Sequence, residues 1–402
     1  MRRQLLLMIF LQFISLSLLA QSTDLEAKWD EGLKFESRDG NFNIRVGGRV
    51  HYDMAFLRQA SALDTVEGGA GSSVEVRRAR LAFSGAINNR FEYEFEFTFG
   101  ETVSYADLYV AFLRVPVVDR VTIGHFREPF GMEEQINSNY IVFMERSLTS
   151  ALGISRNTGI MLQKKLLRDK LHIYTGIYRI TDELAEDLEG DGNHSLSTRF
   201  AYNPLYDSTA NRALHIGLAL NTRTPNDNEY EIKSYNETNT GARYIRTGML
   251  EHVKNVRQIG GELGYSEGNL CLQGEYVHAF ARLSEIEDEL TEQYNREFNA
   301  YYLMASYFLK RGSRKYNVNS NEFSSVSLDE HERLKGAWEL GLRYSRINLL
   351  HTDRQFSSLA DVTLGLNWYF NASTRMMMNY VYSRINGNYT ANSLQFRVQV
   401  SF

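Results

Sequence analysis

The sequence predicts an all-β fold, a transmembrane antiparallel β-barrel of about 16 strands. Three observations predict it. Apolar and polar side chains alternate with a period of two along many segments between residues 42 and 402. These segments number about 16, and an even number of strands is typical of a closed single-chain bacterial barrel. Short connections between the segments alternate with long ones, as periplasmic turns alternate with outer loops in such barrels.

The composition excludes several classes of protein. The chain has 402 residues, of which 43% are hydrophobic and 23% charged, and its formal net charge is -5. This charge indicates no basic surface for nucleic acid. One cysteine excludes an internal disulfide framework and cysteine-built metal sites, and the nine histidines lack the spacing of metal ligands. We therefore expect no metal and no cofactor.

The first 20 residues predict a secretory signal peptide. Arg2 and Arg3 precede an apolar stretch that runs to Leu19, and Ala20 provides a cleavage position. The alternative is a membrane anchor helix, but the apolar stretch is short for the ~20 residues that a span needs. We predict an N-terminal periplasmic segment over residues 21–41 and a single barrel domain over residues 42–402.

The clearest alternation covers residues 91–99, Phe-Glu-Tyr-Glu-Phe-Glu-Phe-Thr-Phe. A strand points successive side chains to opposite faces, so the aromatic residues share one face and Glu92, Glu94 and Glu96 share the other. On a helix these residues are spread around the surface, so the pattern favours a strand. The same alternation recurs over residues 213–221, 361–370 and 393–402.

Strands laid end to end along the chain have 16 candidate centres. They lie near Val46, Arg80, Phe95, Val110, Ile123, Leu162, Ile173, Arg199, Leu218, Leu263, Glu275, Leu303, Leu342, Leu366, Met378 and Phe396. Long connections are expected over residues 57–73, 127–157, 179–194, 223–256 and 282–298. One connection breaks the alternation of lengths, because residues 310–334 are long and polar yet fall on the side of the short turns.

Several features favour a membrane barrel over a soluble β-sandwich, which is the alternative fold. Aromatic residues make up 12% of the chain and prolines number only 4. Aromatic side chains crowd the two interfaces of a membrane barrel, and proline would remove a hydrogen bond from a paired strand. Phe402 follows an alternating segment, which resembles the signal that the barrel assembly machinery of the outer membrane recognises. We expect outer-membrane lipids and lipopolysaccharide as partners, with the acidic runs 182–189 and 285–292 in outer loops.

A series of longer motifs resembles the phosphate-selective porin family of the O and P type. The motifs are residues 47–50, 75–85, 124–134, 139–146, 156–160, 337–345 and 364–370. The resemblance covers most of residues 30–402. It implies a 16-stranded barrel, normally a homotrimer, in the outer membrane of a Gram-negative bacterium. It does not by itself imply phosphate as the solute of this chain.

The resemblance implies that the connection over residues 127–157 is a constriction loop that folds into the lumen. Its apolar residues also need burial, and six charged residues remain for the aperture or for anchoring: Arg127, Glu133, Glu134, Glu145, Arg146 and Arg156. The alternative is an exposed loop whose aromatic residues contact a neighbouring protomer. Phosphate-selective relatives carry a lysine on this loop, and residues 127–157 contain none.

The period of two assigns charged residues to the lumen. The predicted pore-lining residues are Arg45, Arg49, Arg78, Arg80, Arg199, Arg343, Arg375, Arg397, Glu92, Glu94 and Glu96. Guanidinium groups suit phosphate, and rings of Arg or Lys are expected in an anion pore. The glutamates on the same face support another interpretation, a lattice of cross-strand ion pairs with little net selectivity.

These observations predict an outer-membrane porin, not an enzyme, through which small hydrophilic solutes diffuse passively. Anions such as phosphate or polyphosphate are the candidate solutes. The alternatives are a non-selective or weakly selective pore, or an enzyme or adhesin on a barrel scaffold. No Gly-x-Ser-x-Gly elbow and no phosphate-cradling glycine motif supports catalysis.

Overall fold

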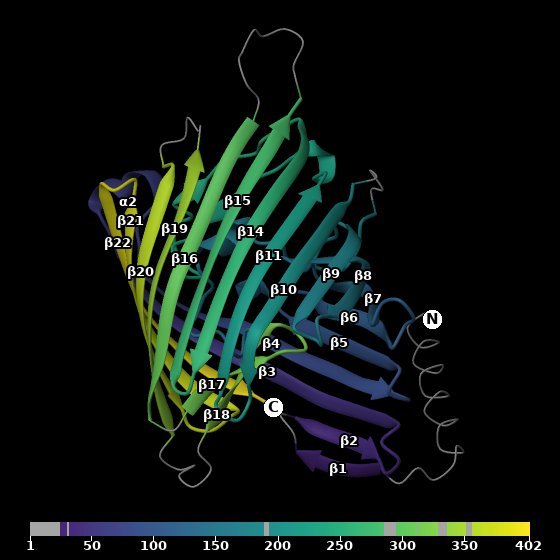
Figure 1. The fold of residues 1–402 in the computed structure, drawn as a ribbon. Coiled ribbons are helices and arrows are strands. Elements are labelled where there is room, and N and C mark those ends of the chain that lie inside the picture. The colour runs from purple at the N-terminus through teal and green to yellow at the C-terminus, as the bar shows by residue number, and fades with distance from the viewer. Residues whose placement is uncertain are drawn as a thin grey trace, which may run out of the picture.

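The computed structural model describes residues 25–29, 32–188, 193–284, 295–310, 312–328, 336–350 and 356–402. The predicted signal peptide and the acidic run 285–292 lie outside these ranges. The described strands form one sheet of 18 strands and two small two-stranded sheets. Two strands of the large sheet, β1 and β2, form a hairpin at its edge, and the other 16 close into an antiparallel barrel (Figure 1).

The barrel strands follow one another in chain order. They are β3 (Phe42–Gln59), β4 (Ser72–Ile87), β5 (Phe91–Phe99), β6 (Val103–Leu113), β7 (Arg120–Arg127), β8 (Arg156–Leu166), β9 (Leu171–Arg179), β10 (Ser195–Asp207), β11 (Arg212–Arg223), β14 (Val253–Glu267), β15 (Leu270–Leu283), β16 (Asn295–Lys310), β19 (Ala337–Leu350), β20 (Ser358–Tyr369), β21 (Thr374–Ile385) and β22 (Tyr389–Ser401). Strand β22 pairs with β3 and closes the barrel. Each of the 16 predicted centres falls within one of these strands, so the predicted strand count and order are confirmed.

The remaining elements lie at the ends of the barrel or inside it. They are β1 (Leu25–Trp29), β2 (Leu33–Ser37), β12 (Lys233–Ser234), β13 (Ile245–Arg246), β17 (Gly312–Asn317), β18 (Glu322–Leu328), the helices α2 (Ser61–Glu67) and α3 (Met132–Gln135), and the 3₁₀ turns η1 (Leu148–Leu152) and η2 (Asn226–Asn228). No helix within the described ranges has the length and the apolar composition to cross a membrane.

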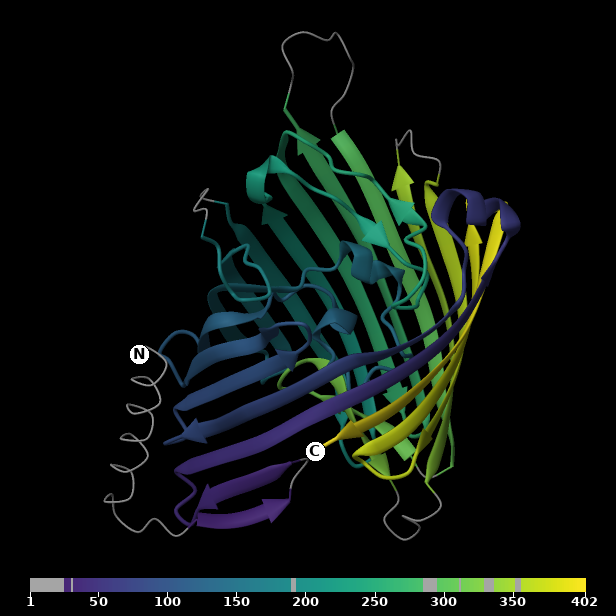
Figure 2. The same cartoon turned by 180° about the vertical axis from the view of Figure 1, so that it is seen from behind.

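The β1–β2 hairpin was not expected from the alternation. Strand β2 pairs with the first residues of β3, Asn43 to Val46, and extends the wall below the point where β22 ends. Figure 2 shows this hairpin beneath β3 at the lower rim. Five residues in each strand are too few to show a clear period of two, so the alternation does not reveal these strands.

Burial alternates along the barrel strands as the sequence predicts. On β19, Leu342 is 51% exposed and faces outward, whereas the adjacent Arg343 is 1% exposed and faces inward. Outward aromatic residues gather near the lower rim, where the rings of Trp338 and Trp368 stack with centroids 5.0 Å apart. The apolar face of each strand therefore meets lipid, and the polar face is enclosed.

Three connections fold into the interior of the barrel. The first joins β7 to β8 over residues 128–155 and carries α3 and η1; we call it the inward loop (Figure 2). The second joins β11 to β14 over residues 224–252. The third is the long connection that broke the alternation of lengths, and it forms the β17–β18 hairpin at the lower end (Figure 1). Met132 and Ile141 of the inward loop pack with Tyr316 and Phe323 of this hairpin in one buried cluster.

Two glycines on the wall make room for the inward loop. Gly341 on β19 lies opposite Gly365 on β20. A Cβ atom at either position would lie 3.0 Å from the ring of Phe143, which is tighter than normal packing. Larger residues at this facing pair would push the loop away from the wall, so the wall and the loop fit each other.

Candidate charged channel

Among the described residues, side chains of the barrel interior line an upper polar cavity, nearer the long connections, and a lower one. The upper cavity has a volume of about 270 Å³ and is lined by β4, by the inward loop and by residues 233–239. The lower cavity has a volume of about 400 Å³ and is lined by β5 to β10, by the inward loop and by the turn between β17 and β18. The inward loop contributes Glu134 and Arg146 to the upper cavity and Gln135 and Asn137 to the lower one.

A β-bulge places two consecutive arginines in the upper cavity. In the register of β3 with β4, His51 lies opposite Arg78 and Tyr52 lies opposite Val76, so Arg77 is an extra residue on β4. The extra residue of a bulge re-aims its neighbours. Val74 and Val76 above the bulge are about 60% exposed and face outward, whereas Arg77 and Arg78 both line the upper cavity.

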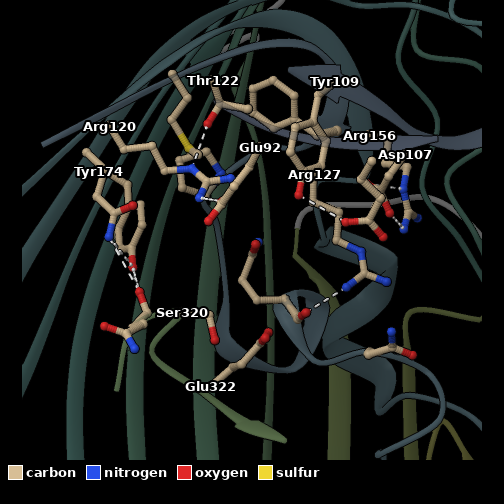
Figure 3. A pocket seen from close by; sticks show the side chains of 18 of the residues that line it. Glu92, Asp107, Tyr109, Arg120, Thr122, Arg127, Arg156, Tyr174, Ser320 and Glu322 are labelled. Carbon is tan, nitrogen blue, oxygen red and sulfur yellow. Dashed lines mark hydrogen bonds and ion pairs between the residues drawn. The ribbon is translucent and has the colours of Figure 1, made fainter. Parts of the chain in front are cut away.

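The lower cavity has a balanced set of charges (Figure 3). Its lining contains five arginines and five carboxylates: Arg49, Arg120, Arg127, Arg156, Arg199, Glu92, Glu94, Glu96, Asp107 and Glu322. Most of these charges are paired. Arg156 holds Asp107 through two hydrogen bonds of 3.1 and 2.7 Å, and Arg120 is paired with Glu92. Buried Arg199 holds Glu262 in the same forked manner on the neighbouring wall.

Buried arginines of the wall fasten the inward loop. Arg397 donates to both oxygens of Asp53 at 2.7 and 2.6 Å and to the Glu145 carboxylate at 2.8 Å. Arg343 donates to Glu133 at 3.1 Å and pairs with Glu237 at 2.6 Å. Such charge-assisted bonds are stronger than neutral ones, so they hold the loop in one position.

Two further arginines support the loop through its backbone. Arg375 donates to the carbonyl oxygen of Ile141 at 3.0 Å. Arg314 of the β17–β18 hairpin donates to the carbonyl oxygen of Tyr140 and holds both oxygens of Glu339 at 2.6 and 2.7 Å. The hairpin therefore ties the underside of the loop to β19.

Among the described residues, three arginines of the cavities make no hydrogen bond to a carboxylate. Among the described residues, Arg78 has no ion-pair partner, and its Nη1 atom is buried without a hydrogen bond. Arg127 donates to the carbonyl oxygens of Gln135 and Ile136 at 2.6 and 3.3 Å. Arg146 also donates to backbone carbonyls, and the nearest carboxylate oxygen, on Glu134, lies 3.6 Å away. These three guanidinium groups therefore line the cavities without a hydrogen bond to a carboxylate, and only Arg146 has a long ion pair, with Glu134.

The environment shifts the pKa of several carboxylates outside the barrel strands. Burial tends to raise the pKa of Glu145, but Arg77, Arg78 and Arg397 outweigh it and hold this pKa well below the usual range. Burial raises the pKa of Glu133, against the opposing effect of Arg343. Burial also raises the pKa of Glu322, to about 7, with Arg127 opposing the rise. Glu322 is thus a carboxylate of the lower cavity whose charge changes near neutral pH.

The predicted wall residues lie in different parts of the barrel. Those in the lining of the lower cavity are Arg49, Glu92, Glu94, Glu96 and Arg199, and Arg78 lines the upper cavity. Arg80 is bonded to Glu96 at 2.9 Å, beside the lower cavity. Arg343, Arg375 and Arg397 lie behind the inward loop and bond to it. Arg45 lies on the part of β3 that pairs with β2, outside the lining of both cavities.

The predicted loop residues divide between lining and anchoring. Arg127 and Arg156 line the lower cavity, and Glu134, Glu145 and Arg146 line the upper one. Glu133 is buried and accepts hydrogen bonds from the Ser147 backbone and hydroxyl at 3.0 and 2.7 Å. The pairing predicted between the neighbouring strands β4 and β5 occurs at Glu96. Glu92 pairs instead with Arg120 on β7, and Glu94 accepts from Tyr109 on β6.

The alternation in the sequence did not identify several charged residues of these cavities, among them Arg77, Arg120, Glu237 and Glu322. A signal existed for Arg77, because the outward apolar residues of β4 change from even to odd numbers between Val76 and Leu81. No local signal marks Glu237 or Glu322, which reach the lumen on connections that fold inward. Among the described residues, no group of His, Cys, Asp and Glu side chains is arranged to hold a metal ion.

Comparisons with known proteins agree with this architecture. Residues 44–402 match the family model of phosphate-selective porin O and P. Porin O of Pseudomonas aeruginosa is 23% identical over 398 residues, which cover 89% of this chain and 86% of that protein.

Two solved structures share the fold. An anion-selective porin from Comamonas acidovorans has a TM-score of 0.55 at 14% identity, with 90% of this chain and 100% of that chain covered. The trimer form of OmpT, an outer membrane protein of Vibrio cholerae, has a TM-score of 0.54 at 11% identity, covering 90% and 99% of the two chains.

The family match extends over nearly the whole barrel, and the 16 closed strands are those of an outer-membrane porin. Such a protein is a channel for passive diffusion of small hydrophilic solutes and lies in the outer membrane of a Gram-negative bacterium. The chain belongs to the family of phosphate-selective porins O and P.

Proposed function

We propose that this porin favours small anions, with inorganic phosphate as a representative solute. The observation that carries the proposal is a set of three arginines that make no hydrogen bond to a described carboxylate, Arg78, Arg127 and Arg146, which line both cavities. A guanidinium group stays charged at every physiological pH and offers a planar set of donors that matches phosphate oxygens. The description of the family and that of the Comamonas porin point in the same direction.

A weakly selective pore is the second candidate, and the lower cavity favours it. Five arginines face five carboxylates there, so the formal charges cancel. Opposite charges on facing walls produce a transverse field, which orients polar solutes without favouring one sign. The upper cavity favours the anion-selective pore instead, because its positive residues outnumber its carboxylates. The positive residues are Arg77, Arg78, Arg146 and Lys233, and the carboxylates are Glu134, Glu145 and Glu237.

We also propose how the chain is divided into segments and how it assembles. A signal peptide over residues 1–20 is removed, residues 21–41 lie in the periplasm, and residues 42–402 form one barrel whose 127–157 loop constricts the pore. The protein acts as a homotrimer, and the trimer form of the Vibrio protein supports this. It catalyses no reaction. Its folding depends on the barrel assembly machinery through Phe402, whose backbone pairs with Gly48 on β3 in both directions.

Conductance across planar bilayers tests the proposed selectivity. In a salt gradient, the reversal potential should show preference for anions, and added phosphate should reduce the chloride current. A reversal potential of zero would support the weakly selective pore. Preference for cations would contradict the anion proposal, and an absence of channels would contradict a porin function.

The charge of Glu322 should make the selectivity depend on pH. Because the pKa of Glu322 is raised to about 7 by burial, its side chain is neutral below this pH and negative above it. We expect the preference for anions to weaken as the pH rises from about 6 to about 8. In Glu322→Gln this change should become smaller, as reversal potentials at the two pH values will show. Glu101→Gln, at an exposed loop, is the matched control. An unaltered pH profile in Glu322→Gln would rule out this role.

A further inference from the structure

A hollow on the outer surface of the barrel lies near the upper rim, away from the channel. It has a volume of about 960 Å³ and is bordered by the upper ends of β10, β11, β14, β15 and β16. Its lining contains two arginines, Arg257 and Arg282, and a group of apolar residues: Leu196, Phe200, Leu220, Ile259 and Phe280. The apolar residues sit on the lipid-facing side of their strands, with Leu196, Leu220, Ile259 and Phe280 each more than 40% exposed.

The two arginines form a compact cationic pair above this apolar floor. Arg257 on β14 lies opposite Phe280 on β15, and Arg282 stands two residues further along β15. Diagonal neighbours of this kind have Cβ atoms about 7 to 8 Å apart, so both guanidinium groups can reach one phosphate. Among the described residues neither arginine has an ion-pair partner, and both are exposed.

Neutral hydrogen-bonding groups complete the upper part of the hollow. Asn255 and Asn295 lie opposite Arg282 on its two neighbouring strands, and Thr222 lies opposite Arg257. Among the described residues, the outward carboxylate Glu297 lies opposite Phe280, and its oxygen is 3.4 Å from His278. The hollow therefore combines a net positive upper part with a lower part that is apolar.

The position along the strands matches the outer leaflet. The long connections mark the upper rim as the outer side of the membrane. At the lower ends of the same strands, Arg212 is paired with Glu267. Within the part of the chain that the structure describes, a cation pair without carboxylate partners thus occurs at the end of β14 and β15 that faces the outer leaflet.

We propose that this hollow binds the lipid A part of lipopolysaccharide. The phosphate of the lipid A headgroup lies between Arg257 and Arg282, and its acyl chains lie on Leu196, Leu220, Ile259 and Phe280. Two charge-assisted contacts to phosphate give specificity, and the apolar contact adds affinity without regard to the headgroup. The proposal depends on the membrane location of the barrel and not on the ion selectivity of its channel.

Binding of defined lipids to the purified, folded barrel tests the proposal. Native mass spectrometry or a lipid titration in detergent compares lipid A with the same lipid lacking its phosphates. We expect wild-type protein to bind phosphorylated lipid A at least about tenfold more tightly. The double variant Arg257→Gln/Arg282→Gln should lose this preference and keep the weak binding of the dephosphorylated lipid.

Arg346→Gln is the matched control, because this outward arginine on β19 is bonded to Asn348 and lies outside the hollow. Folding of each variant is checked by its heat-modifiable band on a gel. Equal binding of the two lipids by wild-type protein overturns the proposal without any variant. A double variant that retains the preference for phosphorylated lipid A overturns the assignment to Arg257 and Arg282.

Discussion

Replacing Arg397 by Met is expected to destabilise the barrel by about 3 to 5 kcal/mol, the usual cost of removing one partner of a buried ion pair. The Arg397 side chain is fully buried and makes both hydrogen bonds to Asp53. Its loss leaves the Asp53 carboxylate, which is 5% exposed, without another ion-pair partner among the described residues. Denaturant unfolding of the barrel in detergent, followed by its heat-modifiable gel band, measures the change in the free energy of unfolding.

The same substitution should also change the channel. Arg397 donates hydrogen bonds to the carbonyl oxygen of Met144 and to the carboxylate of Glu145. In the variant, the inward loop therefore loses both of these bonds to the wall. We expect a higher and more variable single-channel conductance, because the loop no longer keeps one position.

Arg375→Met is the matched control for Arg397→Met. Arg375 is equally buried beneath the inward loop, but it bonds to Ile141, Tyr369 and Gln399 and to no carboxylate. Its removal leaves no charge unpaired, so we expect a loss nearer about 1 kcal/mol, as for ordinary hydrogen bonds. Equal losses in the two variants would show that the ion pair with Asp53 is not the source of stability.

Replacing Arg78 by Ala is expected to remove a large part of the anion preference that we propose. A unit charge about 4 Å from a passing anion stabilises it by about 1 kcal/mol in bulk water and more in a less polar surrounding, so the anion-to-cation permeability ratio should fall by at least about fivefold. Arg78 is the clearest case, because no described carboxylate pairs with it. Reversal potentials in a salt gradient measure the ratio.

Stability distinguishes a selective role of Arg78 from a structural one. The buried Nη1 atom of Arg78 has no hydrogen-bond partner, and an unsatisfied buried donor costs free energy. Arg78→Ala should therefore fold as well as the wild type or better, while its selectivity falls. Arg78→Lys should retain selectivity because it keeps the charge, and Arg257→Ala, outside the channel, should leave it unchanged. A stability loss in Arg78→Ala with unchanged selectivity would contradict the role that we give it.

Much of the fold could be predicted because the information is local. Each strand of the barrel carries its own alternation, as residues 91–99 show, and the sum of such segments gave the strand count and order. The short strands β1 and β2 and the β17–β18 hairpin were not predicted, because their sequences do not alternate over a sufficient length. The bulge at Arg77 was detectable only as a change of phase between Val76 and Leu81.

The charged residues of the interior could be named from the sequence, but their partners could not. The period of two places Arg343, Arg397 and Glu92 on the inner face, yet it contains no information on which charge lies opposite. Arg397 meets Asp53, which is 344 residues away along the chain, and Glu92 meets Arg120 across an intervening strand. Such pairs depend on barrel closure and on the stagger of the strands.

Which residues of this porin face lipid and which face inward follows from the local sequence, since backbone geometry alone sends neighbouring side chains of a strand to opposite sides. Which inward arginines are paired with carboxylates depends on the folded barrel. Closure of the barrel and the insertion of three connections bring most of them against carboxylates or loop carbonyls and leave Arg78 without a described ion-pair partner. The reason is physical: charge pairing depends on distances of a few ångströms between segments that are remote in the chain.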